Sequence, residues 1–185
     1  MKEVLSNILK ELDLCLKKID EHQLIELETK IRQSNRIFVA GAGRSLLMIR
    51  AFAMRLMHMG YTAFVVGETT TPAIEPGDVL IIASGSGNTS TLVVMAEKCK
   101  QIGADLVLIT TNINSKIGKL SDLIIPINAI STKTEEPQNL SVQLGSNTFE
   151  QTVLLMMDAL VIDISSKIPM EENNKSLMKR HANLE

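Results

Sequence analysis

The sequence predicts an α/β protein built on a doubly wound, five-stranded parallel sheet in the order 2-1-3-4-5, flanked by helices. Short aliphatic runs alternate along the chain with longer segments of helical periodicity. A strand that is buried on both faces is a continuous apolar run, which is typical of parallel sheets covered by helices. Two loops that contain glycine each follow such a run and precede a helical segment, as ligand-binding loops do in this fold class.

Five segments have the length and aliphatic content of buried strands. They are residues 37–40, 62–66, a run from 79 to the loop that begins at 84, 105–110 and 123–127. Between them we expect a helix that ends at 59 with Gly60 as its cap, and a helix over 92–99 that is closed by Gly103. Residues 116–120 form at most a short helix, and a long helix over 147–166 follows the last strand.

Two helices are expected ahead of the first strand. An apolar stripe of helical period covers residues 2–19, and a second helix starts at Asp20, with Gln23 at the capping-box position. We expect this pair to pack on both the core and a partner subunit. The 185 residues are expected to form one domain. It consists of the N-terminal helices over 1–35, an α/β core over 36–166 and a polar tail over 167–185, for which the sequence allows either a helix or a coil.

The composition argues against several classes of function. Aromatic residues make up 3% of the chain and Trp is absent, which argues against stacking platforms for nucleic-acid bases. A net charge of −2, spread along the chain, argues against electrostatic binding to nucleic acid or membranes. Cys15 and Cys99 lack metal-ligand spacing and are expected to be reduced thiols. With neither a signal peptide nor an apolar run of about 18 residues, we expect a cytoplasmic protein.

The predicted strand order places the two glycine-containing loops together. In the order 2-1-3-4-5 the topological switch point lies between the first and third strands, where ligands bind at the carboxyl ends. The loop over 41–45 follows the first strand, and the loop over 84–89 follows the third. The sequence therefore predicts a ligand crevice between these loops.

The loop over 84–89 has the composition of a phosphate site. Three of its residues, Ser84, Ser86 and Thr89, can donate hydroxyl hydrogen bonds. Gly85 and Gly87 let the backbone approach the phosphate without a Cβ in the way, and the start of a helix supplies N–H groups. The simpler interpretation is a helix start capped by Asn88 or Thr89, with the glycines only turning the chain.

The loop over 41–45 permits other interpretations. Gly41 and Gly43 would begin a dinucleotide fingerprint, but the third glycine position holds Leu46. The loop over 84–89 lacks the lysine of a nucleotide-binding P-loop. Arg44, with Ser45 beside it, is expected to reach a sugar hydroxyl, a carbonyl or the phosphate, the alternative being a solvated arginine early in a helix.

These motifs resemble those of a known family. Residues 40–45 (AGAGRS), 53–60 (AMRLMHMG), the loop over 84–89 (SGSGNT), 145–151 and 181–185 (HANLE) are similar to the 6-phospho-3-hexuloisomerase family of sugar isomerase domains. The serine loop alone marks the superfamily, and the other segments narrow the resemblance to this family. Leu46 stands where the family commonly has a small residue, so the contacts around Arg44 and Leu46 can differ here.

The resemblance implies an activity and an assembly. Such an isomerase interconverts D-arabino-hex-3-ulose 6-phosphate and D-fructose 6-phosphate through an enediolate, in formaldehyde fixation by the ribulose monophosphate pathway. It needs neither a metal nor a redox cofactor, and it forms a homo-oligomer, here expected to be a tetramer. The alternatives are a sugar-phosphate-binding regulatory module without catalysis, and an aldose–ketose phosphate isomerase for another sugar.

The resemblance also assigns roles to residues outside the two loops. It makes Glu150 the base, although the run from Asn147 to Glu150 also fits a capping box. His181 in the tail is expected to act as a proton shuttle in a site shared between subunits. His58 is the third candidate for a role in the reaction. Alternatively, it is a structural histidine in the core or at an interface, because its neighbours in sequence include several methionines.

The remaining candidates lie in or near the long polar segment over residues 128–146. A loop of this length in a compact domain is usually functional, and we expect it to act as a lid. Gln143 and Ser146 are its expected contacts with the substrate, and Gly43 and Ser45 complete the set from the first loop.

Overall fold

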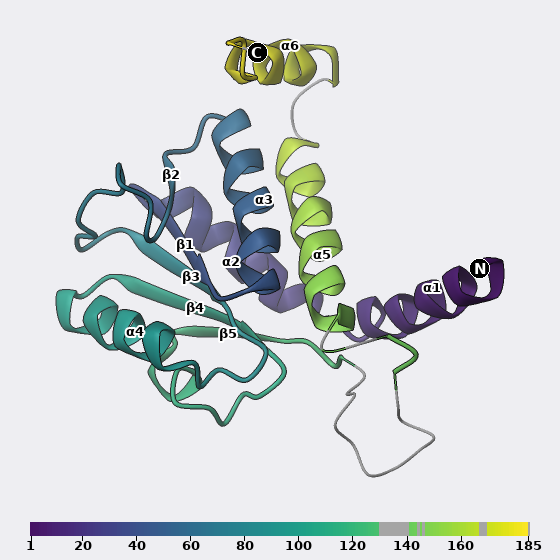
Figure 1. Ribbon diagram of the computed structural model, residues 1–185. Coiled ribbons are helices and arrows are strands. Elements are labelled where there is room, and N and C mark those ends of the chain that lie inside the picture. Colours follow the sequence, from purple (N-terminus) through teal and green to yellow (C-terminus); the bar gives the residue numbers. More distant parts are fainter. Residues whose placement is uncertain (130–140, 144, 146, 167–169, 185) are drawn as a thin grey trace.

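A five-stranded parallel sheet in the order β2-β1-β3-β4-β5 forms the centre of the molecule (Figure 1). The structure is a computed structural model, and it describes residues 1–129, 141–143, 145, 147–166 and 170–184. The strands are β1 (Ile37–Gly41), β2 (Ala63–Val65), β3 (Val79–Ala83), β4 (Asp105–Thr110) and β5 (Leu123–Pro126). The fold class and strand order expected from the sequence are confirmed.

Helices cover both faces of this sheet. They are α1 (Lys2–Leu16), α2 (Glu21–Gln33), α3 (Arg44–His58), α4 (Ser90–Ile102), α5 (Asn147–Ser165), α6 (Met170–Arg180) and a short 3-10 helix η1 (Gly118–Leu120). None of the helices in the described part of the chain is both long and apolar enough to cross a membrane. The C-terminal tail, for which the sequence allowed either a helix or a coil, contains the helix α6.

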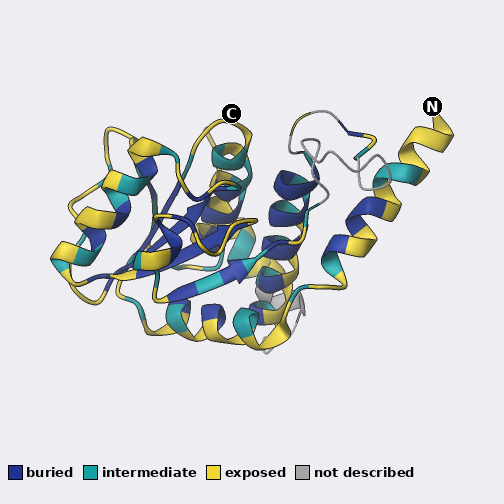
Figure 2. Ribbon diagram, turned by 90° about the horizontal axis from the view of Figure 1, so that it is seen from below, coloured by how far each residue is buried: buried dark blue, intermediate teal, exposed yellow. Residues whose placement is uncertain are grey.

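Successive side chains of the strands enter two different layers of the core, because side chains alternate across a strand. Val39, Ile81 and Ile109 belong to the layer that contains α2, α3 and α5. Phe38 and Leu80, from the same strands, belong to the layer beneath α4. The sheet is consequently buried along its whole centre (Figure 2), which explains why its strands are uninterrupted apolar runs.

The start of α2 differs in detail from the prediction. Asp20 is the N-cap, and its carboxylate accepts a hydrogen bond from the backbone N–H of His22 at 2.9 Å. The reciprocal capping-box bond from Gln23 is not formed, because its buried side-chain Oε1 has no hydrogen-bond partner among the residues that the structure describes. The aspartate cap alone begins this helix.

Helix α1 projects from the body of the protein (Figure 1). Its C-terminal half buries Glu11, Leu12 and Cys15 and packs on α5. The apolar residues of its N-terminal half, such as Leu5 and Leu9, are exposed. In the described part of the chain, the predicted apolar stripe is therefore buried only over the C-terminal half of α1.

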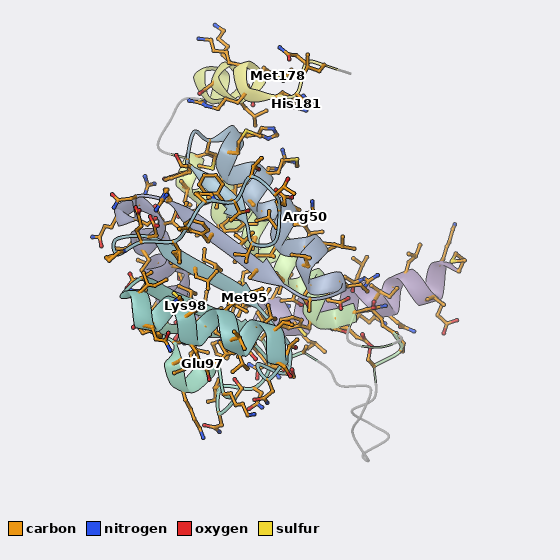
Figure 3. All side chains as sticks on the ribbon, turned by 60° about the vertical axis from the view of Figure 1, so that its left-hand side comes forward. Arg50, Met95, Glu97, Lys98, Met178 and His181 are labelled. Atoms are coloured by element: carbon orange, nitrogen blue, oxygen red, sulfur yellow. The ribbon has the colours of Figure 1, made fainter. Side chains whose placement is uncertain are left out.

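At the other end of the molecule, α6 lies beyond the C-terminal end of α3, where Figure 3 shows Met178 and His181. The guanidinium of Arg180 donates to the backbone carbonyl of His58 at 3.4 Å. The segment between β5 and α5, predicted to be a lid, lies largely outside the described residues. Only residues 128, 129, 141–143 and 145 of it are described.

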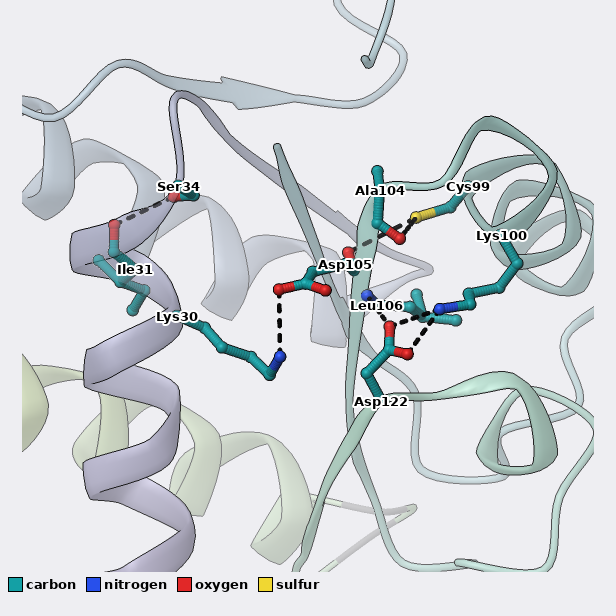
Figure 4. A network of polar contacts seen from close by, with 9 residues as sticks. All are labelled: Lys30, Ile31, Ser34, Cys99, Lys100, Ala104, Asp105, Leu106 and Asp122. Carbon is teal, nitrogen blue, oxygen red and sulfur yellow. Dashed lines mark hydrogen bonds and ion pairs between the residues drawn. The ribbon is translucent and has the colours of Figure 1, made fainter. Parts of the chain in front are cut away.

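The edge of the sheet opposite the predicted crevice is held by a polar network (Figure 4). The carboxylate of Asp122 accepts from Lys100 Nζ at 2.6 and 2.7 Å and from the backbone N–H of Leu106 at 2.8 Å. Lys30 on α2 pairs with Asp105 at 3.1 Å. Burial of the Cys99 thiol, which donates to carbonyls nearby, raises its pKa to about 11. This network ties α2 and α4 to the starts of β4 and β5.

Burial of the Asp122 carboxylate raises its pKa, but the hydrogen bonds from Lys100 and Leu106 outweigh burial and leave the pKa below its ordinary value of 3.8. We expect Asp122→Asn to lower the free energy of unfolding by about 1 kcal/mol at pH 7, because a charged acceptor is lost. A carboxylate whose pKa is lower in the folded than in the unfolded state stabilises the fold at pH values above its unfolded-state pKa. This contribution is lost as the pH falls through the folded-state pKa. The difference from wild type should therefore shrink below pH 3.8.

Urea denaturation at several pH values measures this difference. The control is Asp13→Asn, which removes an exposed ion pair with Lys17 on α1 and should change stability by less than about 0.5 kcal/mol. Equal losses in the two variants would contradict a special role for Asp122.

Candidate active site

The pairing of β1 with β3 brings the two predicted loops together. Gly41 at the end of β1 is in register with Ala83 at the end of β3. The chain then continues into the loop over 41–45 on one strand and the loop over 84–89 on the other. The two loops that the strand order predicted to be neighbours thus leave the sheet from adjacent strand ends.

The serine loop over 84–89 is a tight turn that needs glycine. Gly87 has φ = 61°, and a Cβ there would lie 2.1 Å from Ser115 Oγ. The backbone N–H of Gly87 donates to the hydroxyl of buried Ser84 at 3.2 Å. Gly85 accepts hydrogen bonds through its carbonyl from the hydroxyls of Thr110 and Thr111, at 3.0 and 2.8 Å. The loop is therefore held by the strand ends around it.

The helix start that follows this loop makes no side-chain cap. Thr89 is the N-cap of α4, and its hydroxyl makes no capping hydrogen bond. Asn88 instead donates to the carbonyl of Ser86 at 3.0 Å and accepts from the backbone N–H of Lys116 at 2.9 Å. The capping interpretation of the loop is therefore wrong for both residues. An exposed Ser86 and an uncapped helix start suit an anion.

The loop at the end of β1 also opens a helix without a side-chain cap. Gly43 is the N-cap of α3 and has φ = 56°. A Cβ on Gly41 would lie 2.9 Å from the backbone nitrogen of Leu46. Leu46 itself packs against the core, and Ser45 beside it is partly buried. The leucine at this position thus serves packing, and the helix start faces the crevice between the loops.

Arg44 and Glu150 form an ion pair that joins α3 to α5. The side chain of Glu150 is 11% exposed and that of Arg44 is 54% exposed. The ring of Phe149 lies 3.6 Å from the position of a Cβ on Gly85, so the first turn of α5 covers the serine loop. The structure brings together Arg44, Glu150 and the serine loop, and Arg44 is not merely solvated. Among the described residues, the partner of the Glu150 carboxylate is Arg44.

The remaining predicted contacts of the long loop differ in their placement. Gln143 is buried, and its amide donates to Glu11 and to Thr148 at 3.2 and 3.3 Å. The amide is thereby directed towards α1. Ser146 lies outside the described residues, so its predicted contact remains a prediction.

The two histidines lie together but far from the loops of the same chain. The rings of His58 and His181 stack with centroids 5.4 Å apart. Helix α3 begins at Arg44 and ends at His58. At a rise of 1.5 Å per residue, its length places His58 about 20 Å from Arg44. His58 Nδ1 is buried without a hydrogen-bond partner in the described part of the chain. Burial, with the charges of His181 and Arg55, lowers the pKa of His58.

An apolar cavity of about 290 Å³ lies in another part of the fold. It is bounded by the second face of the sheet and by α4, with Phe38, Leu80 and Met95 among its lining residues. Its lining contains none of the predicted site residues. The predicted polar groups converge instead at the two loops, where Arg44 pairs with Glu150.

Comparisons with known proteins agree with this geometry. The sequence pattern of the SIS domain matches residues 30–160. The chain belongs to the SIS domain family. A 3-hexulose-6-phosphate isomerase of Mycobacterium gastri is 44% identical over 168 residues, covering 91% of this chain and 83% of the relative. A 3-hexulose-6-phosphate isomerase of Bacillus subtilis is 39% identical over 183 residues, covering 99% and 98%.

A solved structure extends the similarity of this SIS domain protein to three dimensions. The crystal structure of a Methanococcus jannaschii protein, described as inferring a 3-hexulose-6-phosphate isomerase function, is 34% identical. Its TM-score is 0.80, and the alignment covers 100% of both chains. The resemblance to 6-phospho-3-hexuloisomerases that the motifs indicated is confirmed.

The sequence prediction missed Glu11, whose carboxylate is buried near the first turn of α5. A signal was present, because this carboxylate stands directly before Leu12 within the apolar stripe of α1. Charged residues are rarely buried without partners, so a carboxylate on the inner face of a helix points to a specific contact. Its partners could not be named from the sequence, since they lie 130 residues or more away.

We expect Gly87→Ala to weaken the binding of inorganic phosphate at least about tenfold, which is about 1.4 kcal/mol. The added Cβ would clash with Ser115 Oγ, and the alanine would have to adopt the positive φ of Gly87. Isothermal titration calorimetry measures the affinity. The control is Gly103→Ala, where φ is +87° but no atom lies within 4 Å of the new Cβ. Equal affinities in the two variants would show that the loop does not hold the anion.

Proposed function

We propose that this protein interconverts D-arabino-hex-3-ulose 6-phosphate and D-fructose 6-phosphate. One observation carries the proposal: a carboxylate, Glu150, is paired with Arg44 beside a loop of hydroxyls and uncapped helix N–H groups. The names of the relatives at 44% and 39% identity support this substrate pair. In this proposal the reaction is a step of formaldehyde fixation by the ribulose monophosphate pathway, and it takes place in the cytoplasm.

The phosphate end of the substrate binds at the serine loop. The hydroxyls of Ser84, Ser86 and Thr89 donate to the phosphate oxygens, and the first N–H groups of α4 add charge complementarity. Gly85 and Gly87 allow the backbone to approach these oxygens. The phosphate thereby fixes the distance from the serine loop to the reacting carbons.

Glu150 moves the proton between C2 and C3 of the sugar. Removing the proton from C2 of the 3-ketose leaves an enediolate across C2 and C3. The hydroxyl proton then passes from O2 to O3, and returning the first proton to C3 gives the 2-ketose. The guanidinium of Arg44 stabilises the negative charge that develops on the enediolate oxygens. Because the 6-hydroxyl is esterified, the 3-ketose cannot close a five-membered ring on it. The substrate is open-chain, and no ring-opening acid is needed in this direction.

A second subunit supplies the histidines. His58 and His181 lie together at the far end of α3 from Arg44, so they serve a site other than that of their own chain. We place them at a neighbouring subunit's crevice, where His181 acts as a proton shuttle with His58 packed against it. Exposed apolar side chains on α3, among them Met54 and Met57, support such packing in a homotetramer.

We expect Glu150→Gln to lower kcat for the interconversion by at least about a thousandfold, since the amide cannot accept the proton. Its affinity for fructose 6-phosphate should remain within about tenfold, some 1.4 kcal/mol. Coupled assay of the 3-hexulose and calorimetry measure the two quantities. The comparison variant is Ser86→Ala, which should mainly raise KM. A Glu150→Gln protein with normal turnover would refute the base, and binding without turnover by the wild type would indicate a regulatory module.

We expect mixed oligomers of His181→Ala and Glu150→Gln subunits to regain part of the activity that each variant lacks alone. A site built across an interface recovers both intact residues when the two kinds of subunit meet. Activity is measured after the subunits are exchanged and the mixed species is isolated by its affinity tags. Verified mixed oligomers that stay inactive would exclude a shared site.

A further inference from the structure

A buried carboxylate on α1 accepts four hydrogen bonds, three from the connection between β5 and α5 and one from the first turn of α5. Glu11 is 8% exposed. Its Oε2 accepts from the hydroxyls of Ser141 and Thr148, at 2.8 and 3.1 Å, and from Gln143 Nε2 at 3.2 Å. Its Oε1 accepts from the backbone N–H of Val142 at 2.7 Å. One carboxylate thus binds three consecutive residues of the loop and the first turn of a helix.

The electrostatics of this cluster favour a charged carboxylate. Burial alone would raise the pKa of Glu11, but the hydrogen bonds from Val142, Ser141, Gln143 and Thr148 outweigh it and lower that pKa. All four donors are neutral groups. A carboxylate that accepts several such bonds stays ionised because each bond favours the charged form.

The same face of α1 also holds the other end of this connection. Cys15, one helical turn after Glu11, donates from Sγ to the carbonyl of Asn128 at 3.2 Å. Residues four apart lie on one face of a helix. Helix α1 therefore contacts the chain both where it leaves β5 and where it enters α5.

The cluster is connected to the reacting end of the site through α5. Thr148 stands two residues before Glu150, and both are in the first turn of the helix. Its hydroxyl also accepts from Gln143 Nε2 at 3.3 Å, and its carbonyl accepts from the hydroxyl of Thr152 at 2.7 Å. Phe149, between Thr148 and Glu150, lies over Gly85. A shift of Thr148 would therefore move both the carboxylate of Glu150 and the cover of the serine loop.

We propose that Glu11 is a positioning residue, which sets the first turn of α5 and thereby the placement of Glu150 against Arg44 and the serine loop. This inference rests on the proposed isomerase function. Glu11 does not touch the substrate. It acts through Thr148 and the residues 141–143, so its loss should impair turnover more than substrate binding.

The test compares Glu11→Gln with Glu3→Gln, which changes an exposed carboxylate on the same helix. The glutamine keeps the size of the side chain but replaces one acceptor oxygen by a donor that faces other donors. We expect kcat for the 3-hexulose to fall at least about tenfold, or 1.4 kcal/mol in barrier height, with KM within about twofold. Glu3→Gln should match the wild type in both constants.

A double-mutant cycle with Thr148→Val tests the route of the effect. If Glu11 acts through Thr148, the double variant should lose little more than the more impaired single variant. Independent, fully additive losses would overturn the route. A Glu11→Gln protein that is folded and has the kcat of Glu3→Gln would overturn the proposal itself. If Glu11→Gln does not fold, Thr148→Val alone carries the test, and an unchanged kcat there overturns the proposal.

Failure of the isomerase function would be recognised separately. A wild-type protein that converts neither sugar refutes the proposed function, whatever the variants do. Amide hydrogen exchange then decides the role of Glu11, because Val142 and the first turn of α5 should exchange faster in Glu11→Gln than in Glu3→Gln. Equal exchange in the two variants would overturn the positioning role.

Discussion

The parallel pairing of β1 with β3, with Gly41 beside Ala83, is the constraint on which the rest of the site depends. The two strands are separated in sequence by α3 and β2, yet their ends are neighbours because the strand order reverses between them. Each strand end runs into a loop that starts a helix without a side-chain cap. Two sets of helix N–H groups are thus directed to one crevice, which is a favourable place for a charged ligand.

The reacting side of the crevice is assembled from segments far apart in the chain. Glu150 meets Arg44 across α3 and α5, and Glu11 reaches the first turn of α5 from α1. Only the phosphate loop is a continuous piece of sequence. On the proposed function, anion binding therefore depends on one local loop, whereas catalysis depends on how α1, α3 and α5 pack.

The histidines show how a sequence pattern can identify residues without locating them. The motifs around the two histidines indicated the family. Neither motif shows that His58 lies about 20 Å from Arg44, a distance set by the length of α3. The stacking of His58 on His181 is equally invisible in the sequence, because α6 must first dock on the end of α3. This separation of the histidines from Arg44 within one chain is the structural reason to propose that subunits share a site.

The sequence by itself determined the strands, their order and the loop that suits a phosphate, because apolar runs, glycines and hydroxyls are local signals. It also indicated Arg44 through its place after the first glycine-containing loop, and Glu150 through the family resemblance. Tertiary structure decided the ion pair between these two, the uncapped state of Thr89, the inward direction of Gln143 and the cluster around Glu11. These contacts join residues up to 137 positions apart. Which buried donor meets which acceptor is set by the packing of helices on the sheet, and no local pattern encodes it.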